Sequence, residues 1–263
     1  MLIVRKIKLS ELANPNLKDT IRTFKDSSLK SLYVIGGVAA FLQLGCLLAL
    51  FVIMTVLGPK PTSAEEYFTI QQSSRLASVL RGDFLLLILI GLYLCTFSAL
   101  YVALKSVNPV YTTLAVLFTF IAVTITFASE SSFSLFHLGD QFSTAATDAQ
   151  RAHFIAAGEA VIASDMWHSS GAYMSGILLQ GSGVIISTIM LKSKDFSKVT
   201  AYSGLLANGL DLLQHIIHPF APSTSVNISM IMGPFYLIWF PMLGWDLLRL
   251  GKGGSNWKAG QQI

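Results

Sequence analysis

The sequence predicts an all-α integral membrane protein with six transmembrane helices, a short amphipathic N-terminal helix and cap helices on the outer side. Of its 263 residues, 53% are hydrophobic and only 12% are charged, against about 25% charged residues in a typical soluble domain. The apolar residues also form blocks close to the ~20 residues that span a hydrocarbon layer. The basic residues gather beside these blocks. We therefore expect a lipid bilayer, and not nucleic acid, as the main partner.

Six apolar blocks are candidate transmembrane helices, because a helix satisfies all of its backbone groups internally when it crosses lipid. They are Ser31–Leu57, Phe84–Leu104, Asn108–Ser129, Ser170–Leu191, Thr200–Phe220 and Ile228–Leu250. The blocks are longer and more continuous than the alternating strands, about ten residues each, of a transmembrane barrel. The predicted transmembrane domain therefore covers residues 31–250.

The orientation follows from lysine and arginine, which are enriched in cytoplasmic loops. Fourteen of the 18 basic residues precede the first span, follow the second and fourth spans, or lie at and beyond the end of the sixth span. The other side carries only Lys60, Arg75, Arg81 and Arg151. This bias predicts a multi-pass protein of the cell membrane with both termini in the cytoplasm, residues 251–263 forming a short cytoplasmic tail.

Residues 1–30 form a basic segment in which Leu17, Ile21 and Phe24 recur at helical spacing. This pattern is typical of an amphipathic helix lying on the inner membrane surface, although a plain cytoplasmic tail is an equally good interpretation. The segment lacks the apolar core and the small-residue cleavage site of a secretory signal peptide.

Two polar excursions, residues 59–83 and 130–169, are predicted to form a small cap on the outer side. Ser63–Glu66 and Thr147–Gln150 have the spacing of a capping box, which opens a helix. The second of these predicts a helix from Asp148 to near Ala163. Arg151 is expected to hold the cap down through an ion pair with an acidic neighbour; the candidate cap residues are Arg151, Glu159, Asp148, Asp140 and Glu130.

The fifth predicted span carries the clearest candidate site, because ionisable residues inside a membrane are costly and usually face the protein interior. Asn208, Asp211, His215 and His218 fall on one face of this helix at spacings of three and four residues. All five histidines of the chain belong to the predicted outer half. The candidate residues for ligand binding or a proton relay are Asp211, Asn208, Gln180 and Glu130.

Three functions fit these residues. Asp211 is a polar latch in a structural, interaction or sensing module with an outward-facing ligand site, with a second copy or another membrane subunit as partner. Alternatively, His215, His218 and His168 hold zinc in a membrane-embedded hydrolase, since zinc takes three or four such ligands. Asp211 and the histidines also suit a proton-coupled transporter of small molecules. The chain lacks the nucleophile elbow and the phosphate-binding and zinc-protease motifs, which favours a protein that is not an enzyme.

Three runs of the sequence resemble a known family. They are Leu138–Phe142 followed by Thr147–Ala160, then Phe196–Gly204, then Gly244–Gly251. Together they are similar to prokaryotic six-span membrane proteins of the domain of unknown function 4386 type, over residues 84–251. The resemblance implies six helices and a prokaryotic cell membrane, and it implies no activity. It also directs attention to Asp140, Gln141, Arg151 and Glu159 rather than to the histidines.

Overall fold

The structure is a computed structural model that describes residues 15–164 and 167–253, with side chains from residue 29 onward. The described residues form α-helices and connecting turns only, which confirms the all-α prediction. The helices are α1 (Pro15–Val56), α2 (Ala64–Ser73), α3 (Arg75–Arg81), α4 (Phe84–Leu104), α5 (Pro109–Ser129), α6 (Ser132–Thr144), α7 (Asp148–Ile162), α8 (Ser170–Met190), α9 (Lys198–Ile217) and α10 (Pro222–Gly251).

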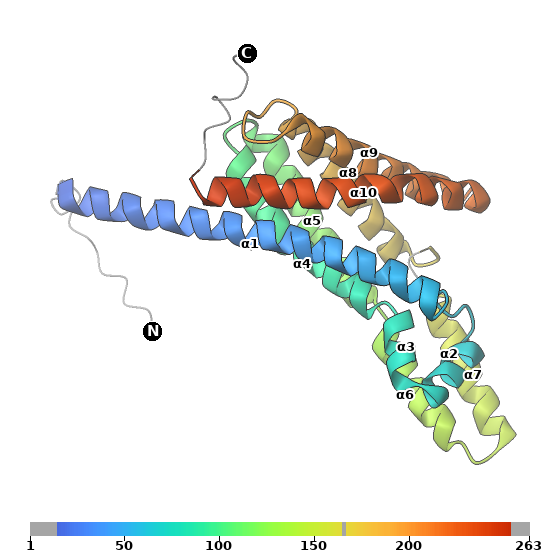
Figure 1. Cartoon of the computed structure of the whole chain (residues 1–263). Coiled ribbons are helices and arrows are strands. Elements are labelled where there is room, and N and C mark those ends of the chain that lie inside the picture. The colour runs from blue at the N-terminus through green and yellow to red at the C-terminus, as the bar shows by residue number, and fades with distance from the viewer. Residues whose placement is uncertain (1–14, 165–166, 254–263) are drawn as a thin grey trace.

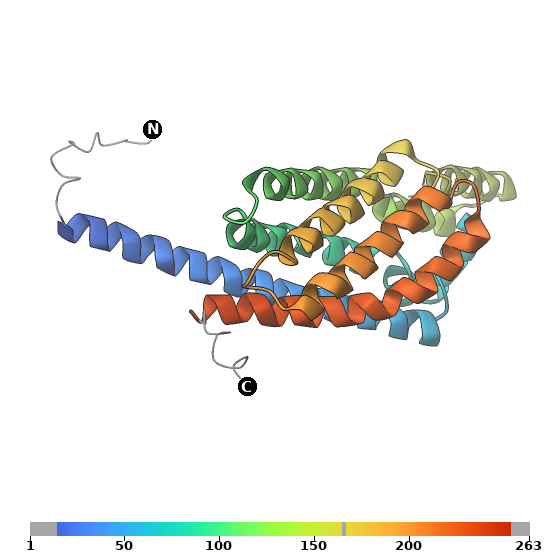
Figure 2. The same cartoon turned by 90° about the horizontal axis from the view of Figure 1, so that it is seen from above.

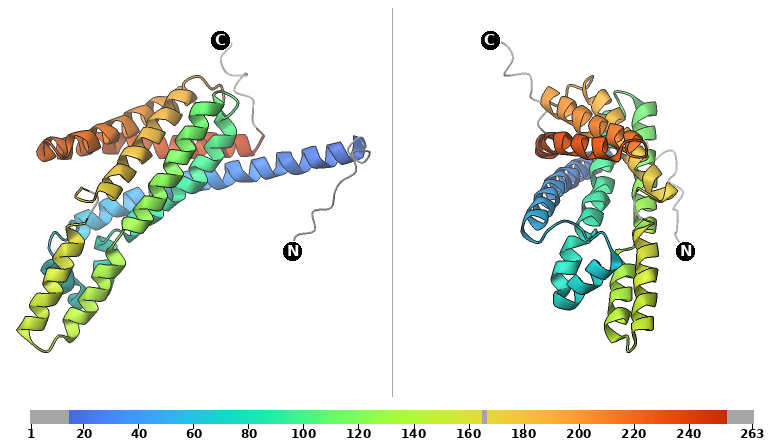
Figure 3. Two further views of the ribbon diagram at one scale, coloured as in Figure 1. Left: turned by 180° about the vertical axis from the view of Figure 1, so that it is seen from behind. Right: turned by 90° about the vertical axis from the view of Figure 1, so that its right-hand side faces the viewer.

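Six of these helices close into a ring. In chain order, α1 packs against α4, α4 against α5, α5 against α8, α8 against α9, and α9 against α10, while α10 returns to α1 (Figures 1 and 2). Short connections join α4 to α5, α8 to α9 and α9 to α10, so these neighbours run antiparallel. The remaining helices, α2, α3, α6 and α7, form a cap at one end of the ring (Figure 3).

Five described segments are long and apolar enough to cross a membrane. They are Leu29–Val56, Phe84–Leu104, Pro109–Thr144, Ser170–Met190 and Pro222–Gly251. Helix α9 is not among them, because polar residues such as Asn208, Asp211 and Gln214 interrupt its apolar sequence. It nevertheless completes the ring between α8 and α10. The chain is therefore a multi-pass membrane protein by composition, with α9 as the polar member of the ring.

The N-terminal segment differs from the prediction. Residues 1–14 lie outside the described residues, and from Pro15 the chain forms one helix of 42 residues that continues without a break to Val56. Proline suits the first position of a helix because its φ is already fixed there. The described part therefore extends the first span (Figure 1) and does not form the separate short helix that the sequence predicted.

The two halves of the ring, α1–α4–α5 and α8–α9–α10, meet along two seams that differ. At the α5–α8 seam, Thr119 and Ser182 share a hydrogen bond of 2.7 Å, and Thr126 donates one of 3.1 Å to Ser175. At the α1–α10 seam, closely packed glycines lie at one end only: a Cβ on Gly37 would come 2.7 Å from Leu248. Small residues of this kind allow two helices in a membrane to approach closely.

A buried carboxylate joins α10 to the start of α9 at the end opposite the cap. Asp246 is 1% exposed and accepts hydrogen bonds from Ser197 N at 3.0 Å and Thr200 Oγ1 at 2.6 Å. Its other oxygen lies 3.1 Å from Nη2 of Arg249. Two of the family-like runs, Phe196–Gly204 and Gly244–Gly251, therefore meet at this carboxylate.

In the cap, α6 and α7 pack on each other, and α2 contacts both of them. A Cβ on Gly139 of α6 would come 2.2 Å from Gln71, and one on Gly158 of α7 would come 2.6 Å from Ala64. At Gly158 the neighbouring atom is the Cβ of Ala64, which cannot turn aside, so glycine is needed there. Both glycines belong to the family-like run from Leu138 to Ala160, so this run packs against α2.

Polar contacts reinforce the cap, and they involve residues that the sequence singled out. Asp140 pairs with Arg75 at 2.8 Å, and Glu159 accepts a hydrogen bond of 2.7 Å from the backbone N of Ala64. Thr147 and Gln150 form the predicted capping box at the start of α7, beside Asp148 in its first turn. Arg151 is exposed and has no ion pair with a residue that the structure describes.

These contacts predict unequal effects of two neighbouring substitutions. Glu159→Ala removes a carboxylate at the N-terminus of α2, so we expect it to lower the free energy of unfolding by about 0.3–1 kcal/mol. Arg151→Ala should change it by less than about 0.5 kcal/mol, as is usual for an exposed side chain. Thermal unfolding of the purified protein measures both. Equal losses would contradict this account of the cap.

Candidate functional site

A cavity of about 840 Å³ lies between the cap and the middle of the ring. All six ring helices contribute to its lining, together with Tyr67 of α2, Leu135 of α6 and Val161 of α7. Its walls are mainly apolar, with residues such as Leu47 and Leu89. This size and composition are typical of small-molecule sites, which occupy roughly 300–1,000 Å³.

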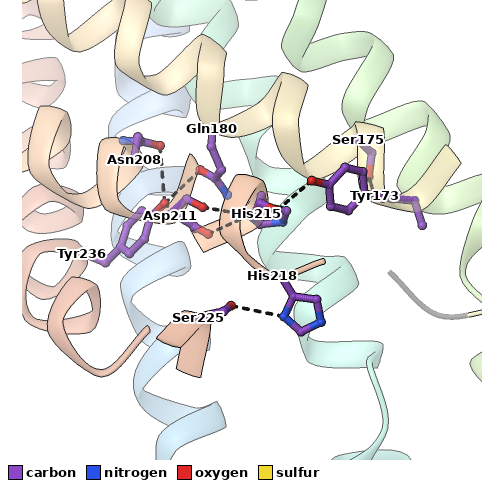
Figure 4. Close-up of polar contacts among 10 residues, drawn as sticks. Tyr173, Ser175, Gln180, Asn208, Asp211, His215, His218, Ser225 and Tyr236 are labelled. Carbon is purple, nitrogen blue, oxygen red and sulfur yellow. Dashed lines mark hydrogen bonds and ion pairs between the residues drawn. The ribbon is translucent and has the colours of Figure 1, made fainter. Parts of the chain in front are cut away.

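Polar side chains gather at the end of the cavity farthest from the cap. Gln180 comes from α8, Asp211, Gln214 and His215 from α9, and Tyr236 from α10. The Tyr236 hydroxyl lies 2.9 Å from Oδ2 of Asp211 and 3.0 Å from Oε1 of Gln180, and Nδ1 of His215 lies 3.2 Å from the other carboxyl oxygen of Asp211 (Figure 4). We call these five residues the polar base.

Two glycines of α8 bring α9 close enough to form the polar base. A Cβ on Gly176 would lie 2.2 Å from Nε2 of His215, and one on Gly183 would lie 2.1 Å from Oδ1 of Asn208. Gly176 and Gly183 are seven residues apart, as are Asn208 and His215, so two turns of each helix are in register. Gly181, which the sequence does not distinguish from them, has open space where its Cβ would be.

Asn208, which lies beside the polar base, and Asp211 both face the hydroxyl of Tyr236. Asn208 donates to the carbonyl of Gly204 at 2.8 Å, which turns its Oδ1 toward Tyr236 at 3.5 Å. The one hydroxyl proton of Tyr236 can serve a single acceptor, and Asp211 is the nearest at 2.9 Å. Gln214 is 9% exposed, and its buried Oε1 has no hydrogen-bond partner among the described residues. The Asp211 carboxylate is therefore held by Tyr236 on one oxygen and by His215 on the other.

The three histidines considered for a metal have different surroundings. His215 is 4% exposed and packs beside Asp211, while His218 stacks on Trp167 at 3.8 Å between ring centroids and hydrogen-bonds to Ser225 at 3.2 Å. His168 lines the cavity from the segment before α8. Among the described residues, no group of three or more His, Cys, Asp or Glu side chains could hold a metal ion.

The cap side of the cavity carries charged groups. Lys60 and Asp83 form an ion pair there, and Glu130 accepts hydrogen bonds from the backbone N and the hydroxyl of Ser132 at 2.8 and 2.6 Å. Glu130 thus lies in the break between α5 and α6, away from Asp211, and it does not join the polar base. Burial raises the pKa of the Tyr67 hydroxyl, which keeps this side chain a neutral member of the lining.

Helical spacing identified Asn208, Asp211 and His215, and the structure places all three on the side of α9 that faces α8 and α10. It could not identify Tyr236 and Trp167, and Gln214 was missed. Tyr236 lies in an apolar span, and aromatic residues in spans are usually explained by packing. Gln214 lies three residues after Asp211, a spacing that places it on the same side of α9, and this signal was available in the sequence.

The chain matches a family model over most of its length. The family is described as a domain of unknown function (DUF4386), and the match covers residues 31–251. Comparison with curated proteins and with solved structures gives no match. The matched region contains α1 from residue 31 onward, the other five ring helices, the cap and the cavity. The chain therefore belongs to the DUF4386 family.

Proposed function

We propose that all six ring helices span the membrane, with the cap outside and both termini in the cytoplasm of a prokaryotic cell. Helix α9 supports this proposal, because it fills the place between α8 and α10 and turns its polar residues toward the interior. The turns that carry Lys105, Lys192 and Lys194 lie at the end of the ring opposite the cap (Figure 1). Basic turns on that side agree with the enrichment of lysine and arginine in cytoplasmic loops.

We propose further that the protein is an outward-facing binding or sensing protein for a small ligand. The observation that carries this proposal is a cavity of about 840 Å³ that all six helices line and that ends at the polar base. A latch that only fixed the helices would need no such space. An apolar cavity with a few convergent polar groups is the usual form of a ligand site.

Thiol accessibility tests this function. Gln214→Cys, made with Cys46 and Cys95 replaced by alanine, places a thiol in the cavity lining. A charged, membrane-impermeant thiol reagent added to intact cells should label it, because a water-filled cavity permits the thiolate that reacts. Leu213→Cys is the matched control, since Leu213 is 42% exposed on the outside of the ring at the same depth.

We expect rapid labelling of Gln214→Cys and little of Leu213→Cys, whose thiol faces lipid. A ligand that occupies the cavity should slow the first reaction. If Gln214→Cys reacts only after the cells are opened, the cavity faces the cytoplasm, and the orientation proposed above is wrong. If it never reacts, the cavity is not a water-accessible site.

Proton-coupled transport is the second candidate function, and the Asp211–His215 contact of 3.2 Å favours it. Beyond the polar base, Trp239 and Phe240 are 0% and 2% exposed and close the cavity toward the opposite end of the ring. A transporter in its outward-open state also has a cavity that is closed toward the cytoplasmic end. If the protein is a transporter, Asp211→Asn should abolish pH-dependent uptake of a ligand into vesicles. A binding protein would show no uptake, whether residue 211 is aspartate or asparagine.

A further inference from the structure

The charged side chains that line the cavity are unbalanced in favour of acids. Among the described residues, the lining has four carboxyl groups and three basic side chains, which are one lysine and two histidines. Histidine is charged in only part of the physiological pH range. Even with both histidines protonated, the formal charge of the lining is negative, and it becomes more negative as they lose their protons. The acids are Asp83, Glu130, Glu159 and Asp211, and the bases are Lys60, His168 and His215.

The one lysine of the lining is paired with an acid of the lining, since Lys60 forms an ion pair with Asp83. Glu130 and Glu159 accept hydrogen bonds from backbone N–H groups at 2.8 and 2.7 Å. Neither of these two carboxylates has an ion pair with a residue that the structure describes. A carboxylate beside an apolar cavity is costly when no cation balances it. A positively charged ligand would remove part of this cost.

Asp211 is the carboxylate best placed for contact with a ligand. It lies at the far end of the cavity, where Tyr236 donates a hydrogen bond to one of its oxygens and His215 lies 3.2 Å from the other. The Asp211 side chain keeps 11% of its surface exposed and lines the cavity. Each carboxylate oxygen can accept a second hydrogen bond. Asp211 can therefore bind a ligand in addition to its two protein partners.

Aromatic side chains line the cavity next to Asp211. Tyr236 stacks on Phe240 at 5.5 Å between ring centroids, and Phe240 lies 6.3 Å from Tyr93, so the three rings form one connected group. All three belong to the lining. An aromatic ring attracts a cation through the negative charge of its face. The rings also offer apolar surface to alkyl groups that such a cation carries.

The cavity does not suit a bare metal ion. Its wall is mainly apolar, and a volume of about 840 Å³ is far larger than one ion. Metal ions of this kind need several oxygen ligands in place of their water. Among the residues that the structure describes, no three His, Cys, Asp or Glu side chains come together as metal ligands. The size and the charge of the cavity are independent observations, and both favour a molecule with a positive group and an apolar body.

From these observations we propose that the cavity binds a small organic cation, an alkylammonium compound whose charge lies at Asp211 and whose alkyl or aryl groups pack against Tyr93, Phe240 and the apolar wall. This proposal rests on the proposed binding function and specifies the class of ligand.

The charge of the cavity is tested with two thiol reagents of similar size and opposite charge, a trimethylammonium-ethyl and a sulfonato-ethyl methanethiosulfonate. The full chain in phosphatidylcholine vesicles carries Ser175→Cys, a position in the lining, and both native cysteines are replaced by alanine. The preference for the cationic reagent should exceed that of free mercaptoethanol at least about tenfold, because a cleft lined by one sign of charge concentrates the opposite sign. An equal or smaller preference refutes the negative cavity and the organic cation together.

The class of ligand is tested with phenyltrimethylammonium and tert-butylbenzene, which have the same shape and differ in charge. Phenyltrimethylammonium should slow labelling of Ser175→Cys by the cationic reagent several-fold, and tert-butylbenzene should leave the rate unchanged. Asp211→Asn should raise the concentration for half-maximal protection at least about tenfold, because the charge that attracts the cation is lost. Asp140→Asn is the matched control, since Asp140 is a carboxylate of the cap that does not line the cavity.

A second variant keeps the test independent of the polar base. Glu130→Gln removes a charge from the lining and keeps an oxygen that can accept the hydrogen bonds from Ser132. It should lower the preference for the cationic reagent, and an unchanged preference would contradict the role of the lining carboxylates. This comparison holds even if Asp211→Asn does not fold.

The remaining outcomes separate the two proposals. If phenyltrimethylammonium and tert-butylbenzene protect equally, or if neither protects, the organic cation is refuted while a water-accessible binding cavity stands. If phenyltrimethylammonium protects Asp211→Asn as well as it protects the protein with aspartate at this position, the contact with Asp211 is refuted. If neither reagent labels Ser175→Cys, the outward-facing cavity is refuted, and both the proposed function and the organic cation fall with it.

Discussion

Asp246→Ala is expected to lower the free energy of unfolding by about 3–5 kcal/mol, the usual cost of removing one partner from a buried ion pair. The Asp246 side chain is 2% exposed, and its oxygens accept from Ser197 N and Thr200 and contact Arg249. Alanine leaves the charge of Arg249 without this carboxylate and removes the acceptor at the start of α9. Because α9 and α10 pack together from this point, we expect the whole α9–α10 pair to loosen.

The measurement is equilibrium unfolding of the purified protein in mixed micelles, with Asp140→Ala as the control. Asp140 also pairs with an arginine, but the Asp140 and Arg75 side chains are 44% and 62% exposed. Exposed pairs contribute about 0–1 kcal/mol, so the control should stay within that range. Similar losses for both variants would show that burial does not govern these two ion pairs.

Gly176→Ala is expected to destabilise the protein by about 1–3 kcal/mol, the usual cost of adding atoms to a packed interior. The new methyl would come 2.2 Å from Nε2 of His215, whose ring is fixed by Asp211 and by packing on Trp167. The ring has to move, and the polar base moves with it. Thermal unfolding measures the stability, and labelling of Ser175→Cys measures the change in the cavity.

A second substitution in the same background tests the cause. His215→Gly removes the ring that obstructs the new methyl, so Gly176→Ala should cost less in that background than in the wild type. Gly181→Ala is the matched control, because its Cβ has open space and alanine is favoured over glycine inside a helix by about 1 kcal/mol. A loss at Gly181 as large as at Gly176 would contradict the steric explanation.

The positions of the helices were largely predictable. The second predicted span, Phe84–Leu104, is a helix over those residues, and helices α8 and α9 begin and end within three residues of the bounds predicted for the fourth and fifth spans. Apolar blocks and capping residues are local signals, so a sequence reveals them. The continuous α1 was harder to predict, because the change from basic to apolar residues near Lys30 marks a change of surroundings and does not interrupt a helix.

The candidate site was predictable only in part. Asn208, Asp211 and His215 share a face of one helix, and helical geometry relates them without any other element. Their partners on other helices depend on which faces meet. Tyr236 reaches Asp211 because α10 packs on α9. The glycines of α8 leave space for side chains of α9, which their own positions in the sequence do not reveal. The role of Asp246 was missed for the same reason, since its partners begin 49 residues earlier in the chain.

The ring also constrains the order in which the protein is assembled during translation. Five of its six contacts join consecutive helices of the ring, so each of these can form as the next span leaves the ribosome. The contact of α1 with α10 is the exception, because Gly37 meets Leu248, more than two hundred residues later. Until α10 is made, the glycine face of α1 lies open to other helices in the membrane. The first span to be synthesised is therefore the last to find its full set of neighbours.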